Sequence, residues 1–430
     1  MPDLAIDFCG IKSPNPFWLA SGPPTNSGEQ IMRAFDTGWG GAVWKTLGNP
    51  AVNVNSRYAA MSHGGNKIVG LNNIELITDR GLSVNLKEMA EVKKSYPDHA
   101  VIASIMVESR SQWQEIIMKV EDTGADGLEL NFSCPHGMCE RGMGSAIGQE
   151  PKIAEEITRW AKEAASIPVL VKLTPNVADI REQGNAAKSG GADGVSLINT
   201  IKSIIGVDLN DFIPYPKLRN GSTNGGYCGP AVKPIALHMA ATLCRDQQFN
   251  LQVSGIGGIS SWQDAAEFIA LGCTSIQVCT AVMHHGFGIV TAMIDGLSLY
   301  MAEHNMEDLN ALRGRAIENY KEWGELDMNY KVVASVSGQE CIGCHKCYTA
   351  CRDGAYQAID LSGKMSRAGK AIPVVILERC TGCNLCSLVC PVNCISMQDV
   401  SATDEVDSWQ DIIARGEYVI TDGLAAGLAD

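Results

Sequence analysis

Two segments of the chain, CIGCHKCYTAC at residues 341–351 and CTGCNLCSLVCP at residues 380–391, decide the fold of its C-terminal part. Both follow the spacing C-x2-C-x2-C-x3-C, and a proline follows the last cysteine of the second segment. Thiolates at this tight spacing surround one face of an iron–sulfur cubane. The small residues Gly343 and Gly382 allow backbone amides to approach the cluster sulfurs. The repeat therefore predicts two [4Fe-4S] clusters.

The double motif resembles that of the bacterial two-cluster ferredoxins, in which each motif supplies the fourth ligand of the other cluster. The resemblance implies that one cluster is held by Cys341, Cys344, Cys347 and Cys390, and the other by Cys380, Cys383, Cys386 and Cys351. The alternative, structural zinc, normally uses two short cysteine pairs rather than a four-cysteine motif that recurs 39 positions later. This part of the chain is expected to carry single electrons and to have no substrate chemistry of its own.

The composition of the whole chain is that of an α/β enzyme, with 430 residues, 45% hydrophobic residues and 44 glycines. No apolar run approaches the length of a membrane span, and the N-terminus has no secretory pattern. Nine of the 16 cysteines fall between Cys341 and Cys394, so a disulfide framework is not expected. We expect a cytoplasmic protein that does not associate with membranes.

The net charge of −14 argues against nucleic-acid binding, which calls for basic patches. Half of this charge lies in residues 399–430, which hold eight acidic residues and one basic residue. We interpret this segment as a solvated acidic tail.

Short β-branched segments alternate with helical segments through the first 300 residues, and this pattern predicts a (β/α)8 TIM barrel. The expected strands are 17–21, 42–46, 101–106, 127–131, 168–173, 194–199, 251–255 and 275–279. A doubly wound sheet is the alternative. It usually carries a G-x-G-x-x-G turn early in the chain, and this sequence has none.

Polar residues gather where the expected strands end, which is where the active sites of such barrels lie. They include Lys45, Thr46, Asn131, Lys172, Asn199, Thr200, Cys279 and Thr280. The loop SGIGG at residues 254–258 follows the seventh strand and is suited to a phosphate. Two buried lysines need an anionic or electron-rich partner. FMN meets both requirements, and it also converts the single electrons of the clusters into the hydride that saturates a C=C bond.

The segment NFSCPHGMCERGMGSAIGQ at residues 131–149 places Cys134 in a glycine-rich loop, 132–149, that we expect to be catalytic. A thiol has a reference pKa of about 8.5, so it can act as a general acid or base near neutral pH. Glycines 137, 142, 144 and 148 would allow the loop to close over a substrate.

These motifs, with KLTPNVADI, SGGADGV, INT, AVKPIAL and GIGGI, resemble the dihydropyrimidine dehydrogenases of the dihydroorotate dehydrogenase superfamily. The resemblance covers about residues 4–305 and continues to about 398. It implies an FMN-binding barrel at 1–305, a helical linker at 306–335, a ferredoxin domain at 336–398 and the acidic tail at 399–430.

Carried over by position, the resemblance implies two sets of binding residues and one catalytic residue, Cys134. The FMN set is Ser21, Lys45, Thr46, Asn131, Lys172, Gly229, Ile256, Gly257, Gly258, Cys279 and Thr280. The substrate set is Asn73, Glu75, Asn131, Ser133, Asn199 and Thr200. Asparagine amides offer a donor and an acceptor, which suits the carbonyl and N–H groups of a pyrimidine ring. Cys139 replaces a family glycine in the loop, and SGIGG replaces a shorter glycine pair.

The implied reaction interconverts uracil or thymine with the 5,6-dihydro compound, exchanging a hydride at C6 and a proton at C5, as in pyrimidine catabolism. The sequence contains no dinucleotide fingerprint, so it resembles the two-subunit bacterial type. A separate subunit with FAD and NAD would then exchange electrons with the clusters. The expected assembly is a hetero-oligomer, a heterotetramer with a homodimeric core.

Two alternatives remain beside this prediction. One is a dihydroorotate dehydrogenase-like flavoenzyme that acts on another cyclic amide. The carboxylate of Glu75 argues against orotate itself, because two like charges close together in a dry pocket repel. The other is an electron-transfer module whose barrel is only a scaffold, and this would leave Cys134, Lys45 and Lys172 without a role.

Overall fold

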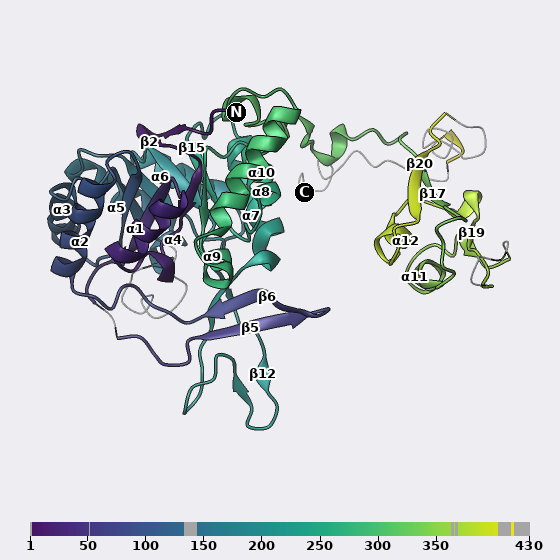
Figure 1. Cartoon of the computed structure of the whole chain (residues 1–430), viewed down its shortest axis with the longest axis horizontal. Coiled ribbons are helices and arrows are strands. Elements are labelled where there is room, and N and C mark those ends of the chain that lie inside the picture. Colours follow the sequence, from purple (N-terminus) through teal and green to yellow (C-terminus); the bar gives the residue numbers. More distant parts are fainter. Residues whose placement is uncertain are drawn as a thin grey trace, which may run out of the picture. The chain divides into compact units, whose positions relative to one another are not determined.

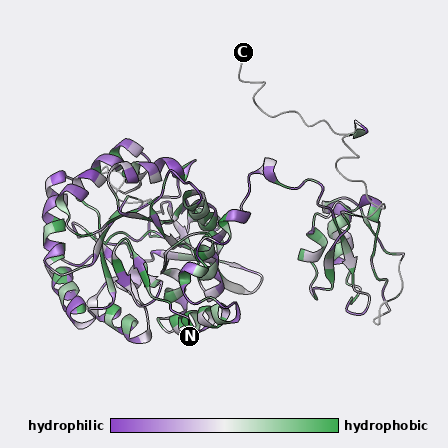
Figure 2. Cartoon of the chain, turned by 90° about the horizontal axis from the view of Figure 1, so that it is seen from above, coloured by the Kyte–Doolittle hydropathy of each residue, from purple (hydrophilic) through white to green (hydrophobic). Residues whose placement is uncertain are grey.

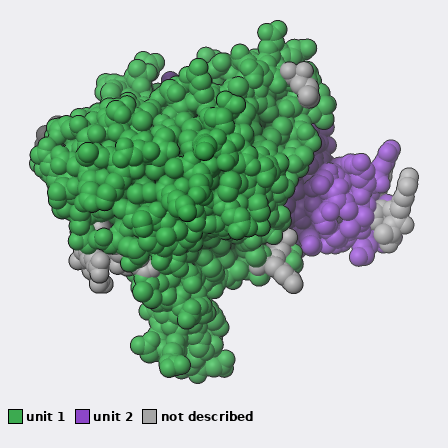
Figure 3. Space-filling view, turned by 60° about the vertical axis from the view of Figure 1, so that its left-hand side comes forward, with its two compact units in different colours: residues 1–320 green, residues 321–430 purple. Residues whose placement is uncertain are grey.

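The structure, a computed structural model, describes residues 2–50, 52–132, 144–362, 365, 369–402 and 414–416. It divides into two compact units, Met1–Tyr320 and Lys321–Asp430, which Figure 3 shows in different colours. Within the described ranges, every helix is too short or too polar to cross a membrane.

Unit 1 is a closed barrel of eight parallel strands (Figure 1). In chain order its strands are β3 (Phe17–Leu19), β4 (Gly41–Leu47), β7 (Ala100–Ile105), β8 (Gly127–Asn131), β9 (Val169–Lys172), β10 (Gly194–Leu197), β15 (Gln252–Ile256) and β16 (Ser275–Val278). Each coincides with one of the strands expected from the sequence, and β16 pairs with β3 to close the barrel. The predicted (β/α)8 barrel is therefore confirmed.

A ring of helices surrounds these strands, with hydrophilic residues along its outer side (Figure 2). The helices are α1 (Gly28–Thr37), α2 (Leu82–Ser95), α3 (Arg110–Glu121), α5 (Pro151–Ala164), α6 (Ile180–Ser189), α7 (Lys233–Cys244), α8 (Trp262–Ala270) and α10 (Ile289–Glu303). Side chains at several helix N-termini accept hydrogen bonds from free backbone N–H groups, for example Ser109 at α3 and Ser261 at α8.

The amino end of the barrel is closed by a hairpin of β1 (Ile6–Phe8) and β2 (Ile11–Ser13). Phe8 and Ile11 are buried in one hydrophobic cluster with residues of the barrel strands, including Trp18 of β3. Since this end is filled by hydrophobic side chains, a ligand can enter only at the opposite end, where the strands have their carboxyl termini.

Additional elements extend from the carboxyl end of the barrel. An antiparallel sheet has the order β11 (Ile201–Ser203), β14 (Gly225–Cys228), β6 (Asn66–Asn73) and β5 (Tyr58–His63). Beside it lie the strands β12 (Val207–Asp208) and β13 (Ile213–Pro214), and Figure 1 shows β5, β6 and β12 outside the barrel. Two short helices, α4 (Ser145–Gly148) and α9 (Thr280–His285), and two 3-10 turns, η1 (Pro23–Thr25) and η3 (Pro230–Val232), complete this end.

The segment expected to be a helical linker, 306–335, contains the 3-10 turns η4 (Leu309–Ala311), η5 (Ile317–Asn319) and η6 (Trp323–Glu325). Its first part belongs to unit 1, because Leu309 and Leu312 are buried in the hydrophobic core and the N–H of Ala316 donates to the carbonyl of Ala270 at 2.8 Å. The compact barrel unit thus extends past residue 305 to Tyr320.

The described part of unit 2 includes two antiparallel strand pairs and two helices that begin inside the cysteine motifs. The strand pairs are β17 (Val332–Val336) with β20 (Ile395–Asp399), and β18 (Ile359–Asp360) with β19 (Val374–Val375). The helices are α11 (Lys346–Gly354) and α12 (Leu385–Leu388), and the 3-10 turn η7 (Leu377–Arg379) precedes the second motif.

Two fully buried tryptophans of unit 1 allow a test of one hydrogen bond between the barrel and its helices. The indole N–H of Trp44 donates to the amide oxygen of Asn85 on α2 at 3.0 Å, whereas that of Trp113 has no partner in the described part of the chain. Trp44→Phe leaves the buried Asn85 oxygen unpaired, which costs about 1–3 kcal/mol. We expect Trp44→Phe to lower the free energy of unfolding in urea more than Trp113→Phe does. Equal losses would contradict this assignment.

Candidate functional site

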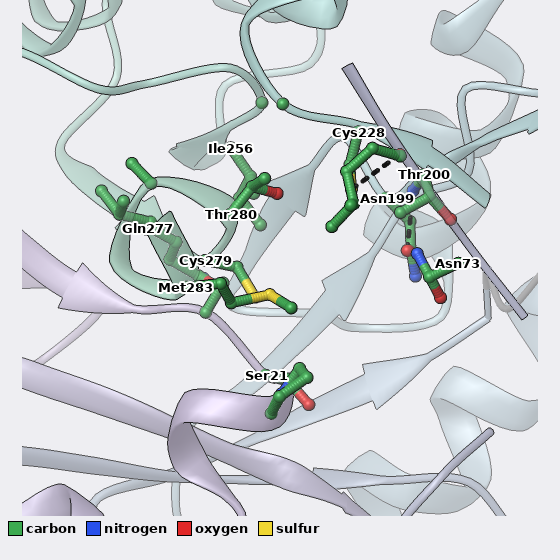
Figure 4. A pocket seen from close by; sticks show the side chains of 18 of the residues that line it. Ser21, Asn73, Asn199, Thr200, Cys228, Ile256, Gln277, Cys279, Thr280 and Met283 are labelled. Atoms are coloured by element: carbon green, nitrogen blue, oxygen red, sulfur yellow. Dashed lines mark hydrogen bonds between the residues drawn. The ribbon is translucent and has the colours of Figure 1, made fainter. Parts of the chain in front are cut away.

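A cavity of about 260 Å³ opens at the carboxyl ends of the barrel strands (Figure 4). Every residue of the two predicted binding sets that the structure describes lines this cavity. These residues are Ser21, Lys45, Thr46, Asn73, Glu75, Asn131, Lys172, Asn199, Thr200, Gly229, Ile256, Gly257, Gly258, Cys279 and Thr280. Residues separated by up to 259 positions, from Ser21 to Thr280, thus meet in one place.

Ser133 and Cys134 lie outside the described residues, as does Cys139. The role of Cys134 therefore stays a prediction. The described ends of the loop predicted to be catalytic lie against the barrel, since Phe132 is buried and Gly148 packs on its carbonyl oxygen.

Three glycines form a cradle at one part of the cavity. Gly229, Gly257 and Gly258 have φ angles of +90°, +131° and +74°, which residues with side chains rarely adopt. A Cβ atom at Gly258 would lie 2.7 Å from Cβ of Lys233 and 3.0 Å from the carbonyl oxygen of Gly229. Backbone N–H groups without side chains above them are the donors that bind phosphate. The cradle therefore fits the phosphate of FMN.

The two lysines of the cavity are buried, and each faces a carboxylate. Nζ of Lys45 lies 2.5 Å from Oε1 of Glu75, and the two side chains are 6% and 9% exposed. Nζ of Lys172 lies 3.5 Å from Oε1 of Glu129, which is fully buried. The sequence suggested different ligands for Lys45 and Glu75, but the structure pairs them with each other. It also supplies a partner to Lys172 that the sequence analysis did not identify.

Glu75 also contacts Arg57, just before β5, and Tyr58, the first residue of β5. Arg57 approaches its Oε1 to 3.6 Å, and the hydroxyl of Tyr58 donates to its Oε2. Sequence reasoning missed both residues because it did not predict the β5–β6 hairpin. The cations Lys45 and Arg57 offset the charge of Glu75, so the argument against a substrate carboxylate is weaker than the sequence suggested.

A chain of hydrogen bonds orients the amides at the base of the cavity. The hydroxyl of Thr46 lies 2.9 Å from that of Ser104 and accepts from Nδ2 of Asn131 at 2.9 Å. Oδ1 of Asn131 accepts from Nδ2 of Asn199 at 3.3 Å, and Ser21 contacts Thr46 at 3.2 Å. Because the Asn131 amide bonds through both of its ends, its orientation is set before a ligand binds.

Asn73 of β6 and Thr200, just before β11, both lie next to Gly226 of β14 in the antiparallel sheet. Nδ2 of Asn73 donates to the carbonyl of Gly226 at 3.0 Å, and a Cβ atom at Gly226 would overlap the side chain of Thr200. Figure 4 shows Asn73, Asn199 and Thr200 together in one part of the cavity. This part presents amide and hydroxyl groups that can recognise a polar, planar ring.

Two thiols, Cys228 and Cys279, also line the cavity. Burial raises the pKa of Cys279 to about 12, and burial raises the pKa of Cys228 as well. The Cys228 thiol donates to the carbonyl of Leu71 at 3.3 Å. Both thiols are protonated at neutral pH and act as small uncharged lining groups rather than as bases.

In unit 2, a small cavity is lined by Cys351, Cys380, Cys383 and Cys386, the set predicted for one cluster. In the other predicted set, Cys341 and Cys344 lie near Cys347. Burial and the neighbouring thiols of Cys344, Cys386 and Cys341 raise the pKa of Cys347 to about 11.

Backbone N–H groups point at the sulfurs of both sets. The donors are Ala358 to Cys351 at 3.3 Å, Gly343 to Cys341 at 3.4 Å and Cys394 to Cys390 at 3.4 Å. Such N–H···S bonds stabilise thiolates, so the residues fit two clusters. The sulfur of Cys394 lies 3.6 Å from that of Cys390 and is buried.

A family model described as dihydroorotate dehydrogenase matches residues 3–301. The chain belongs to the dihydroorotate dehydrogenase family. It is therefore an oxidoreductase, as predicted. A second model, described as a 4Fe-4S dicluster domain, matches residues 334–397 and confirms the predicted iron–sulfur domain.

Three curated relatives are similar to most of this chain. The NAD-dependent dihydropyrimidine dehydrogenase subunit PreA of Escherichia coli (strain K12) is 42% identical over 400 residues, which cover 93% of this chain and 96% of that protein. The chloroplastic dihydropyrimidine dehydrogenase (NADP(+)) of Arabidopsis thaliana is 42% identical over 74% of this chain and 78% of its own length. The catalytic subunit of dihydroorotate dehydrogenase B (NAD(+)) of Pyrococcus abyssi is 38% identical over 73% of this chain and 99% of its own length.

The glycine cradle predicts a selective loss of FMN on substitution. In Gly258→Ala the new methyl group must displace Lys233 or the Gly229 carbonyl, and overpacking of this kind costs about 1–3 kcal/mol. We expect the dissociation constant of FMN, measured by flavin fluorescence with the apoprotein, to rise about 10- to 100-fold.

The matched control is Gly286→Ala, which has a similar φ of +79° but nothing within 4 Å of the added methyl. It should bind FMN as the wild type does. A similar loss in both variants would mean that backbone strain, and not the cradle, is responsible.

The cysteine sets predict a specific loss of iron. Cys351→Ala removes one predicted ligand from the set that lines the unit 2 cavity. If one of the two clusters is lost, bound iron and acid-labile sulfide should fall towards half of the wild-type amounts. Cys394→Ala removes a buried thiol that belongs to neither set and should leave both quantities unchanged. Loss of iron in the second variant would show that Cys394 is itself a ligand.

Proposed function

We propose that this chain interconverts uracil or thymine with the corresponding 5,6-dihydropyrimidine. The observation that carries the proposal is the composition of the strand-end cavity, where a glycine cradle, two buried lysines and a set of oriented amides meet. The E. coli relative named as a dihydropyrimidine dehydrogenase subunit supports it, because the similarity extends over 93% of this chain.

FMN would be held by residues in or just after six barrel strands, together with Gly229. Gly229, Gly257 and Gly258 would bind its phosphate, with Ile256, Cys279 and Thr280 beside them. Ser21, Lys45, Thr46, Asn131 and Lys172 would surround the ring. When bound, FMN supplies the exchange of a hydride with C6 of the pyrimidine.

The amides of Asn73, Asn131 and Asn199 would orient the pyrimidine by pairing with its carbonyl and N–H groups. Thr200 and Ser133 would add hydroxyl contacts, and Glu75 would accept from a ring N–H. Because these amides are already oriented, little freedom is lost when the substrate binds.

Cys134 would exchange the proton at C5. In the oxidative direction its thiolate takes this proton while the hydride leaves C6, and in the reductive direction the thiol returns it. The two transfers together form or saturate the C5–C6 double bond, and the two electrons of the hydride remain to be carried away or supplied.

Those electrons would pass one at a time through the two [4Fe-4S] clusters to or from a partner subunit that binds FAD and NAD. The E. coli relative is named as an NAD-dependent subunit, which supports a partner of this kind. We expect a cytoplasmic hetero-oligomer, a heterotetramer with a homodimeric core.

A second function, action on dihydroorotate or another cyclic amide, is favoured by one observation. The pairing of Glu75 with Lys45 and Arg57 lowers the repulsion that a substrate carboxylate would meet. Against it, the Pyrococcus relative matches 73% of this chain at nearly its full length, so about a quarter of this chain has no counterpart there.

The deciding experiment is anaerobic reduction of the purified chain by dihydrouracil, followed in the flavin absorption band. We expect bleaching in the wild type. In Cys134→Ala we expect bleaching about 10²- to 10⁴-fold slower, because that is the usual contribution of a general acid or base. Cys9→Ala, which removes a thiol at the amino end of the barrel that donates to the Asp193 carbonyl, should match the wild type.

Each other outcome has a distinct meaning. Bleaching by dihydroorotate but not by dihydrouracil would establish the second function. Bleaching by neither compound would favour the alternative in which the chain is an electron-transfer module. Equal bleaching rates in Cys134→Ala and the wild type would show that the Cys134 thiol does not transfer the proton.

A further inference from the structure

Glu129 is a fully buried carboxylate that the proposed reaction does not use. It lies on β8 two residues before Asn131, so both side chains point into the barrel and Glu129 is one layer deeper. It does not line the cavity described above. Burial of a carboxylate away from water is costly, so this group calls for a physical explanation.

The contacts of Glu129 are with two hydrogen-bond donors and one lysine. Its Oε2 accepts from the hydroxyl of Ser196 at 2.7 Å and from Nε2 of Gln277 at 3.2 Å. Its Oε1 accepts no hydrogen bond in the described part of the chain and faces Nζ of Lys172 at 3.5 Å. Neutral donors thus fix Oε2 of the carboxylate, and Oε1 faces a single lysine.

Lys172 lies between this carboxylate and the cavity. It is 5% exposed, it lines the cavity, and Glu129 is the carboxylate within ion-pair distance in the described structure. The arrangement differs from that of Lys45, whose partner Glu75 lines the cavity and can contact a ligand. The Lys172–Glu129 pair therefore presents its positive end to the cavity and its negative end to the barrel interior.

We propose that Glu129 is a positioning residue that holds Lys172 at the base of the cavity and lowers the reduction potential of the flavin. The proposal rests on FMN occupying this cavity, as proposed above. The reduced form of the flavin ring carries more negative charge than the oxidised form. A cation beside the ring therefore favours reduction, and an anion behind that cation disfavours reduction. Both charges are buried, so salt screens neither of them much.

Because Lys172 lies between Glu129 and the cavity, each substitution should shift the reduction potential of the flavin in a defined direction. Glu129→Gln keeps the size of the side chain and removes the opposing charge, so the potential should rise. Lys172→Met removes the cation and leaves Glu129 uncompensated, so the potential should fall below that of the wild type. Each change should alter the equilibrium constant for reduction at least tenfold, which is about 30 mV for a two-electron couple.

The experiment is a spectroelectrochemical titration of the flavin in the full-length protein with its clusters. Ser196→Ala is the matched control, since it removes the shortest hydrogen bond to Glu129 but keeps its charge. Its potential should stay close to that of the wild type. A rise in Glu129→Gln with little change in Ser196→Ala supports the electrostatic role. No rise, or an equal rise in both variants, overturns it.

A double variant keeps the proposal testable if Glu129→Gln does not fold. Glu129→Gln/Lys172→Met removes both charges, and replacing a buried ion pair by neutral groups is often tolerated. Its potential should lie above that of Lys172→Met, because the uncompensated carboxylate is gone. Equal potentials in the two would refute the role of Glu129.

The failure of this inference can be separated from failure of the proposed function. If the wild type binds no FMN, the cavity assignment is wrong and the inference falls with it. If the wild type binds FMN and oxidises dihydrouracil but Glu129→Gln leaves the potential unchanged, the function stands and only the role of Glu129 is refuted.

Discussion

The parallel pairing of eight strands into a closed barrel is the constraint on which the rest of the structure depends. Closure brings every strand's carboxyl end to one rim, so residues far apart in the chain face a common cavity. The β1–β2 hairpin closes the opposite end with Phe8 and Ile11. The ligand site of the barrel thus lies at one of its ends, where the loops can vary without loss of the core.

Compensation of buried charge is the second feature that shapes the site. Two lysines line the cavity, and a buried cation without a partner is costly. The protein gives each lysine a carboxylate, but places Glu75 at the cavity and Glu129 beneath it. One ion pair thus offers both of its charges to the cavity, whereas the other offers only its cation.

The sequence predicted the barrel and the iron–sulfur domain correctly because each has a local signal. Strand periodicity, C-x2-C spacing and polar residues directly after β-branched segments can all be identified without knowing the fold. Arg57, Tyr58 and Glu129 had no such signal. Arg57 and Tyr58 reach the site through the β5–β6 hairpin, whose strands the sequence did not predict. Glu129 lies inside β8, where the alternation of side chains along the strand shows only that it faces inward.

By itself, the sequence determined that this chain is a strand–helix barrel followed by a two-cluster domain, because those patterns depend on neighbouring residues and on spacing. The tertiary structure alone decided which charges pair. Lys45 meets Glu75 across 30 positions, and Lys172 on β9 meets Glu129 on the neighbouring strand β8 across 43. The energy of such a pair depends on distance and burial, and neither quantity is written in the order of the residues.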